Sequence, residues 1–521
     1  MKNLFCIAVL LWCTSCVSVK TYNERLETPL APEKLHQDTD YAYQKLQKLH
    51  PELYWYISKE ELDEKFARVK AGIDQPLNPA EFYTRLAPVI SEVKQGHLRL
   101  VPPSRRLTRA ETRDLEKQKG LLSRYNFLVD GDRIFVKDNA DQIPDMNVGT
   151  EILSIKDIPV KELLAKYRPW VNSDGENQTF QKYSMARRWP VFFTLEHGIL
   201  DSVKLETLYK NEIKTFYLQR EKMTKEELKK EEAQNKKLTQ SQPGKVKDYN
   251  IRTRSFNRDL QFPTADSTIA YMKIKTFSGR HSRKFYKQSF EILKNSPAEH
   301  LILDVRDNLG GSLSEINNLY SYLVAEEFRF IKDIEVTSRS AMFQAAYFSQ
   351  MPRFIYPVAA AVYPVYLAGT ALSVKQKDGR FYLRNNGTFA LKKPKDNNFK
   401  GKIYVLVNGS SFSAASILPA KLKGEGRAMI IGEETGGAND GTVAGRYARV
   451  KLPHSRLGMP TGLMLIQPDI PFSLTKKGVI PHHEIVPTPL QVLAKKDIQL
   501  EWVMEHIKAQ AQQPFTNETK D

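Results

Sequence analysis

The stretch LILDVRDNLGGS, residues 301–312, decides the fold. It begins as a short apolar run and ends at two adjacent glycines, a pattern typical of a buried strand that leads into a sharp turn. Three further runs of this kind occur in the chain: residues 269–274, 403–407 and 429–432. A helix is expected after the first of them, because Tyr286, Phe290 and Leu293 recur at helical spacing. This alternation predicts a layered α/β core.

Two of these strand ends carry residues suited to chemistry. In VNGSSFSAAS, residues 407–416, a strand leads into an expected helix, whose N-terminus offers free amides and a dipole that favours negative charge. The simpler interpretation is that these serines only cap the helix. The run lacks the GxSxG pattern, which argues against an α/β-hydrolase. At the other strand end, the amides of Gly310 and Gly311 are either oxyanion donors or part of a plain turn.

A histidine near the start of the chain is the third candidate. His97 lies in QGHLRL, residues 95–100, between a glycine and an expected strand, which is an unusual place for a core histidine. Its ordinary pKa suits a general base at neutral pH. A purely structural histidine is the alternative.

The N-terminal half is expected to hold two units ahead of the core. Residues 36–120 form a helical unit that ends in the GHLRL motif, with Asn78 and Pro79 at the start of one helix. Its helices are predicted from two apolar faces: Leu62, Phe66, Val69 and Ile73, and Phe82, Leu86, Val89 and Val93. Residues 121–220 read as short strands, and TEILSIKDIPVKELL at 150–164 resembles part of a PDZ-like module, with Asp157 where glycine is usual. A plain β-rich insertion is the alternative.

The remaining segments are assigned by composition. Residues 17–35 are expected to be a tether, and the charged residues 221–260 a solvated helix and linker that begins with a capping box of Thr224 and Glu227. The α/β core then spans residues 261–495, and residues 496–521 form a closing helix and a polar tail.

Residues 1–16 are typical of an export signal. Lys2 precedes a nine-residue apolar run that is too short to span ~30 Å of hydrocarbon. Small residues then precede Cys16, as in a bacterial lipobox, although Cys13 stands where an aliphatic residue is usual. We therefore expect a lipoprotein attached through Cys16 to a membrane of the bacterial cell envelope, facing the periplasm or the cell surface. An ordinary signal peptide cut nearby is the alternative.

The composition also limits the kinds of site and of binding partner that the protein can have. The only cysteines are Cys6, Cys13 and Cys16, so the body of the protein has no disulfide, zinc knuckle or thiol nucleophile. The formal net charge of +18 is spread along the chain without a dense basic block, which favours contact with anionic surfaces such as lipid headgroups over nucleic-acid binding.

Together the motifs resemble those of the C-terminal-processing peptidase and tricorn-core family of serine peptidases, the tail-specific proteases. The family shows DGHT-like, LDxRxNxGG, VLVNxxTxSAAE and IIGExTGG motifs in this order, and here they read QGHLRL, LDVRDNLGG, VLVNGSSFSAAS and IIGEETGG. The resemblance extends over residues 36–495, including GVIPHHEIVPT at 478–488. It implies a Clp-protease/crotonase-like ββα core with an N-terminal helical unit and a PDZ-like β-rich insert.

The resemblance also implies roles for single residues. Ser413 matches the nucleophile, Gly311 and the amide of Ala414 match the oxyanion hole, and Gly310 supports the turn. One branch of the family uses a lysine base after the serine, but that slot is Ala438 here. In the tricorn-like branch the histidine of the GH motif is the base, a role that falls to His97.

Three positions depart from the family pattern, each of them an acidic residue there: Gln95, Ser416 and His482. The group that orients His97 is therefore left open among three carboxylates: Glu433, Glu434 and Glu484.

The function implied is an exported serine endopeptidase that hydrolyses peptides or proteins through an acyl-enzyme. No metal or cofactor is expected. The alternative is a catalytically impaired peptide-binding protein on the same fold, because a missing orienting acid lowers activity. An acyl-CoA enzyme of the crotonase type shares the core shape, but export and the Ser/His motifs argue against it.

Overall fold

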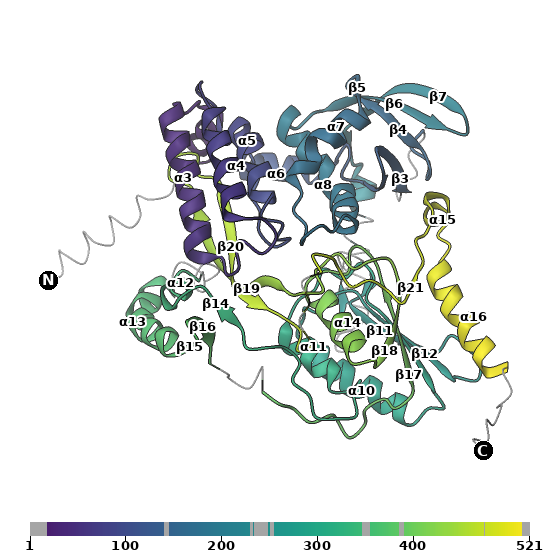
Figure 1. Ribbon diagram of the computed structural model, residues 1–521. Coiled ribbons are helices and arrows are strands. Elements are labelled where there is room, and N and C mark those ends of the chain that lie inside the picture. Colours follow the sequence, from purple (N-terminus) through teal and green to yellow (C-terminus); the bar gives the residue numbers. More distant parts are fainter. Residues whose placement is uncertain are drawn as a thin grey trace, which may run out of the picture.

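The computed structural model describes residues 18–139, 145–229, 233, 248–250, 255–345, 355–384, 390–471, 473 and 475–512 (Figure 1). Its centre is a six-stranded sheet in which every neighbouring pair is parallel except the first. In spatial order its strands are β11 (Arg258–Gln261), β12 (Ile269–Ile274), β13 (His300–Asp304), β17 (Lys402–Val407), β18 (Ala428–Gly432) and β21 (His483–Glu484). The α/β core and its four expected strands are confirmed.

Helices cover both faces of this sheet. α10 (Ser282–Lys294), α11 (Leu313–Tyr320) and α14 (Ala414–Gly424) belong to one layer, and α16 (Ile498–Gln512) covers the opposite face (Figure 1). Because successive strand residues point to opposite faces, Ile302 and Leu406 contact α16, whereas Leu303 and Val405 belong to the cluster that contains the α10 and α14 side chains. Both faces are buried, which explains the unbroken apolar runs in the sequence.

A second sheet links the core to the N-terminal helices. It is antiparallel, and its strands in spatial order are β15 (Val374–Lys377), β16 (Arg380–Leu383), β14 (Glu335–Val336), β20 (Gly458–Ile466) and β19 (Thr442–Lys451). The β19–β20 hairpin runs alongside α3 (Pro32–Leu49) in Figure 1. At its tip, the buried carboxylate of Asp38 accepts the amides of His454 (2.9 Å) and Ser455 (2.7 Å).

The N-terminal unit contains α2 (Val19–Glu27), α3, α4 (Lys59–Ala71), α5 (Pro79–Ser91) and α6 (Arg109–Leu115). α5 begins as predicted, with Asn78 as N-cap in a capping box and Pro79 at the first position. The expectation of a tether over residues 17–35 is wrong, because α2 and the first residues of α3 occupy most of it. Ser18 caps α2 and accepts the amide of Thr21, a local signal that the polar composition concealed.

The middle unit is built on an antiparallel sheet of β2 (Tyr125–Asp130), β3 (Arg133–Asn139), β4 (Glu151–Ile155), β6 (Ser202–Tyr209) and β7 (Glu212–Gln219), with β5 (Ile158–Pro159) paired to β4. Lys156 and Asp157 both have positive φ in the turn before β5 and α7 (Val160–Tyr167), which is the strand, turn and helix expected there.

The helix α8 (Thr179–His197), which packs on β2, was not predicted. Its apolar side chains are not confined to one stripe and Pro190 lies inside it, so helical periodicity is weak.

Shorter elements complete the described chain: β1 (Gln118–Lys119), η1 (Arg168–Trp170), β8 (Glu221–Lys222), β9 (Tyr249–Asn250), β10 (Ser255–Phe256), α12 (Arg339–Met342), α13 (Tyr356–Leu372) and α15 (Pro489–Leu493). The predicted capping box of Thr224 and Glu227 is present. Most of the linker beyond it, and residues 1–17 with Cys16, lie outside the described residues. Among the residues that are described, no helix combines the length and apolar character needed to cross a membrane.

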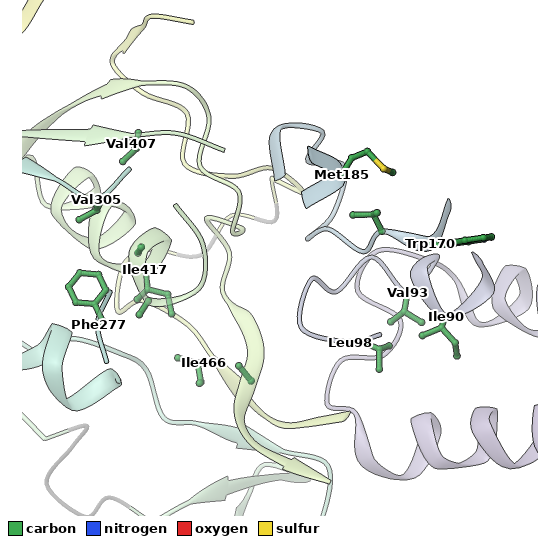
Figure 2. Packing of buried hydrophobic residues seen from close by; sticks show 14 of the residues in the cluster. Ile90, Val93, Leu98, Trp170, Met185, Phe277, Val305, Val407, Ile417 and Ile466 are labelled. Carbon is green, nitrogen blue, oxygen red and sulfur yellow. The ribbon is translucent and has the colours of Figure 1, made fainter. Parts of the chain in front are cut away.

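One buried apolar cluster joins the three units. Figure 2 shows Ile90, Val93 and Leu98 from the helical unit together with Phe277 and Ile417 from the core, all members of this cluster. The relative positions of the units therefore depend on shared burial of apolar surface.

We expect the contact of α16 with the sheet to contribute strongly to stability. Ile507 is 5% exposed against that face, so Ile507→Ala should lower the free energy of unfolding by about 2–4 kcal/mol through lost burial and the cavity left behind. Ile292→Ala on α10 is the matched control, since Ile292 is 52% exposed and should change stability by less than about 0.5 kcal/mol. Urea unfolding followed by circular dichroism measures both, and equal losses would contradict the assignment.

Candidate active site

Ser413 lies at the N-cap of α14 in a conformation that few residues adopt. Its φ of 58° and ψ of −121° fall in a region that is strained for any residue with a Cβ atom. Two hydrogen bonds to the neighbouring loop hold the turn in place. The amide of Phe412 donates to the carbonyl of Asn308 (3.0 Å), and the Ser411 hydroxyl donates to the carbonyl of Val305 (2.9 Å). These hydrogen bonds therefore fix the position of Ser413 in the turn that follows β17.

The three neighbouring serines are engaged in hydrogen bonds. The Ser410 hydroxyl accepts from Arg187 (2.7 Å), Ser411 also accepts the amide of Asn408 (3.0 Å), and Ser416 donates to the carbonyl of Ser411 (2.8 Å). Within the described residues, no group forms a hydrogen bond with the hydroxyl of Ser413. Of these four serines, Ser413 is the one whose hydroxyl has no hydrogen-bond partner among the described residues.

The glycine turn after β13 comes very close to Ser413. Gly310 and Gly311 have φ of 95° and 150°, and a Cβ atom on Gly310 would lie 2.7 Å from the carbonyl oxygen of Phe412 and 2.9 Å from the amide nitrogen of Ala414. Only glycine fits there. The Gly310 amide donates to the side chain of Asn308 (2.8 Å).

By contrast, no described residue accepts a hydrogen bond from the amide of Gly311 or of Ala414. Two unused amides thus lie next to Ser413.

The same strand end is fixed by a buried ion cluster. Burial alone would raise the pKa of Asp304, but Lys273 and Arg306 hold it below its ordinary value. Arg306 also pairs with Asp497 (2.7 Å), just before α16. The charged residues of LDVRDNLGG are therefore structural, and they tie the turn to the C-terminal helix.

His97 reaches the site from the segment after α5. Its ring lies against the ring of Phe412, with centroids 4.7 Å apart, and its Nδ1 is 3.0 Å from the hydroxyl of Tyr447 on β19. Its Nε2 is buried and has no hydrogen-bond partner among the described residues. Burial, with a smaller effect from Arg99, lowers the pKa of His97 to about 4, so the imidazole is neutral at pH 7.

A buried carboxylate that the sequence did not indicate holds this segment in place. Asp174 accepts the amide of Gly96 (2.6 Å) and the amide of Ala438 (3.1 Å), and so connects the GH motif to the IIGEETGG motif. Burial raises its pKa to about 6 against the effect of these two bonds. Asp174 lies in the polar stretch NSDGENQ, residues 172–178, which shows only turn signals.

None of the three carboxylates considered for orienting His97 does so. Glu433 accepts from Tyr183 (2.5 Å), Glu434 accepts the amide of Gly478 (2.6 Å), and Glu484 is exposed on β21. The side chain that forms a hydrogen bond with the imidazole is that of Tyr447, at a separation of 350 residues from His97. No local pattern could have revealed this pair.

The residues at the positions that depart from the family pattern form hydrogen bonds or are buried. Ser416 bonds within its turn, and the Nδ1 of His482 accepts the amide of Ile430 (2.9 Å). Gln95 is buried, and its carbonyl accepts the amide of Leu98 (2.9 Å). Ala438 is buried as well, so the slot of the lysine base holds only a methyl group.

α8 of the middle unit also contacts the turn that carries Ser413. The ring of Phe180 stacks on Phe412 with centroids 4.3 Å apart, so Phe412 contacts both Phe180 and His97. Asn177 and Thr179 donate to the carbonyls of Thr435 (2.9 Å) and Glu434 (3.0 Å).

Among the described residues, no group of His, Cys, Asp and Glu side chains is arranged to hold a metal ion.

The chain is similar to known proteins both in part of its sequence and in its fold. The model of peptidase family S41 matches residues 268–485. Among solved structures, the fold is similar to that of mature CPAF, with a TM-score of 0.60 and 15% identity over 92% of this chain and 96% of that one. CPAF complexed with lactacystin gives a TM-score of 0.61 at 15% identity, over 92% and 98%.

The photosystem II D1 C-terminal processing protease is a more distant likeness, with a TM-score of 0.41 and 14% identity over 89% of this chain and 98% of that one. No curated protein sequence matches the chain. Residues 268–485, which hold the turn of Gly310 and Gly311 and also Ser413, match the model of peptidase family S41, in agreement with the resemblance predicted from the four motifs.

Proposed function

We propose that the protein is a serine endopeptidase in which Ser413 is the nucleophile and His97 the general base. The observation that carries this proposal is the position of Ser413. Its unbonded hydroxyl lies at a strained helix start, next to the two unused amides of Gly311 and Ala414. The neutral, buried imidazole of His97 lies against Phe412, the residue that precedes Ser413. The match of residues 268–485 to a peptidase family supports a peptide or protein as the substrate.

The proposed reaction follows from these groups. The Ser413 oxygen attacks the peptide carbonyl carbon while its proton passes to Nε2 of His97, and the carbonyl oxygen becomes an oxyanion bound by the amides of Gly311 and Ala414. The C–N bond then breaks, and His97 gives the proton to the departing amine. Water repeats the attack on the acyl-enzyme, with His97 again as base, and releases the acid.

The hydrogen bond with Tyr447 is compatible with the tautomer that this reaction needs. For Nε2 to accept a proton, the hydrogen of neutral His97 must be on Nδ1, where it donates to the hydroxyl oxygen of Tyr447. A tyrosine is neutral, so it stabilises the imidazolium less than a carboxylate would. No hydrogen bond joins Ser413 to His97 in the described structure, and in free enzymes such bonds often tighten only when substrate binds.

One observation favours the alternative of a peptide-binding protein with an impaired site. Among the described residues, no carboxylate forms a hydrogen bond with His97. The two functions differ in a covalent step, so a covalent probe separates them.

We further propose that the protein is exported and attached to a bacterial envelope membrane through a lipid on Cys16. The sequence of residues 1–16 supports this, together with a net charge of +18, which favours an anionic surface.

Ser413→Ala should abolish peptide hydrolysis and labelling by a fluorophosphonate probe, because each of the other serine hydroxyls in the turn is engaged in a hydrogen bond and Ser413 lies beside the two amides. Ser410→Ala is the matched control. It loses one hydrogen bond to Arg187 and should still be labelled. Labelling is measured by gel fluorescence. If Ser413→Ala is still labelled, the nucleophile is misassigned, and if the wild-type protein neither reacts nor cleaves unstructured peptides, the binding protein is the correct function.

The pH dependence of kcat/KM should show that the general base is buried. Because burial favours the neutral form of His97, kcat/KM should stay high below pH 6.5 and fall only toward about pH 4, and His97→Ala should lose roughly 10²–10⁴-fold. The profile is measured with an unstructured fluorogenic peptide. Asp174→Asn is the control, since the raised pKa of Asp174, about 6, gives it a separate titration. An acid limb at 6–7 that persists in Asp174→Asn would contradict a buried base.

The anchoring proposal predicts that Cys16→Ser moves the protein from the membrane fraction to the soluble fraction, because Cys16 is the only cysteine expected to survive processing. Immunoblotting of fractions after a high-salt wash measures this. Retention of the variant in the washed membrane would refute lipidation at Cys16.

A further inference from the structure

A cavity of about 640 Å³ lies at the opposite end of the β19–β20 hairpin from the core. It is enclosed by α2, the beginning of α3, the segment 101–106 after the GHLRL motif, and the turn that joins β19 to β20. Neither Ser413 nor His97 lines it. Part of its wall is apolar, formed by side chains of α2, the link between α2 and α3, the segment 101–106 and the hairpin turn: Tyr22, Leu26, Leu30, Val101 and Leu457.

The rest of the lining is strongly basic. Five cationic side chains line the cavity and no carboxylate does: Arg25, Lys34, Arg106, Lys451 and Arg456. In the part of the chain that the structure describes, none of the five forms an ion pair with an acidic residue. Arg105, next in sequence to one of them, does pair with Glu111 (2.8 Å), so carboxylates are available nearby but absent from the cavity.

The cations are held close to one another. Partial burial lowers the pKa of Lys451, and the positive charges of Arg456, Arg106 and Arg25 lower it further. Both backbone groups of Arg106 are bonded to the side chain of Asn23 on α2, at 2.8 and 2.9 Å. Its guanidinium lies 3.9 Å from the ring centroid of Tyr22. Like charges gathered in this way without a counter-charge favour the binding of an anion.

We propose that this cavity binds a phosphate ester, with the phosphate among the five cations and the attached organic group against the apolar wall. Arginine guanidinium groups, three of which line the cavity, bind phosphate oxygens with paired hydrogen bonds. A phospholipid headgroup and a soluble phosphate ester share this chemistry.

The position of the cavity favours the lipid as source. Cys16, the expected site of lipid attachment, precedes the cap of α2 by two residues, a span of at most roughly 7 Å. An anchor there would bring the cavity to the bilayer surface, where a cluster of cations contacts anionic headgroups. The lipid source rests on this anchoring, whereas binding of a phosphate ester as such does not, and neither requires peptidase activity.

The test is hydrogen–deuterium exchange on the full chain at fixed ionic strength. The probes are glycerol phosphate, vesicles of phosphatidylcholine containing phosphatidylglycerol, and vesicles of phosphatidylcholine alone. Amides of residues 19–27 and 101–106 should exchange more slowly with the phosphate ester or the anionic vesicles than with chloride or neutral vesicles. The double substitution Arg106→Gln with Lys451→Gln should weaken the binding about 10- to 30-fold, since two cations contacting the phosphate are lost.

A control variant with the same change of charge is Lys284→Gln with Lys287→Gln, two exposed lysines on α10, which should bind as the wild type does. Lys451→Arg keeps the charge and should bind too, even if the double variant is unstable. Protection by anionic vesicles assigns a lipid headgroup, and protection by glycerol phosphate alone assigns a soluble ester. The proposal is overturned if neither probe protects these segments, or if the double variant and the lysine control are weakened equally.

Discussion

The close contact between two backbone turns is the constraint on which the site depends. The turn after β13 and the turn after β17 come so near that any side chain on Gly310 would collide with the backbone of Phe412 and Ala414. Parallel strands that are neighbours in a sheet end at the same edge, so their following loops must share this space. Gly310 makes the contact possible, and beside it two amides and one serine hydroxyl have no hydrogen-bond partner among the described residues.

Around this contact, groups from distant parts of the chain form a single structure. Phe412 contacts both His97 of the N-terminal unit and Phe180 of the middle unit, while Asp174 accepts the amides of Gly96, beside His97, and of Ala438. The base is therefore positioned by buried contacts that depend on the docking of the units. Such an arrangement keeps the imidazole neutral through burial and supplies Tyr447 in place of a carboxylate.

Charge is used in two different ways in the molecule. In the core, the buried carboxylate of Asp304 is paired with Lys273 and Arg306, because an unpaired buried charge is costly. Asp174 is buried as well and accepts two backbone amides instead. At the tip of the β19–β20 hairpin, several cations meet around a cavity that no carboxylate of the described residues lines.

The sequence by itself determined the α/β core, its strand ends and the place of Ser413, because these depend on local apolar runs, glycines and serines within a few residues of one another. The cap of α5 at Asn78 was equally local. The helix α8 was not predicted, since burial on several sides removes the periodicity that marks a surface helix. The partner of His97, the bridge made by Asp174 and the basic cavity were decided only by tertiary structure. Each joins residues tens to hundreds of positions apart, and their proximity results from the packing of whole units.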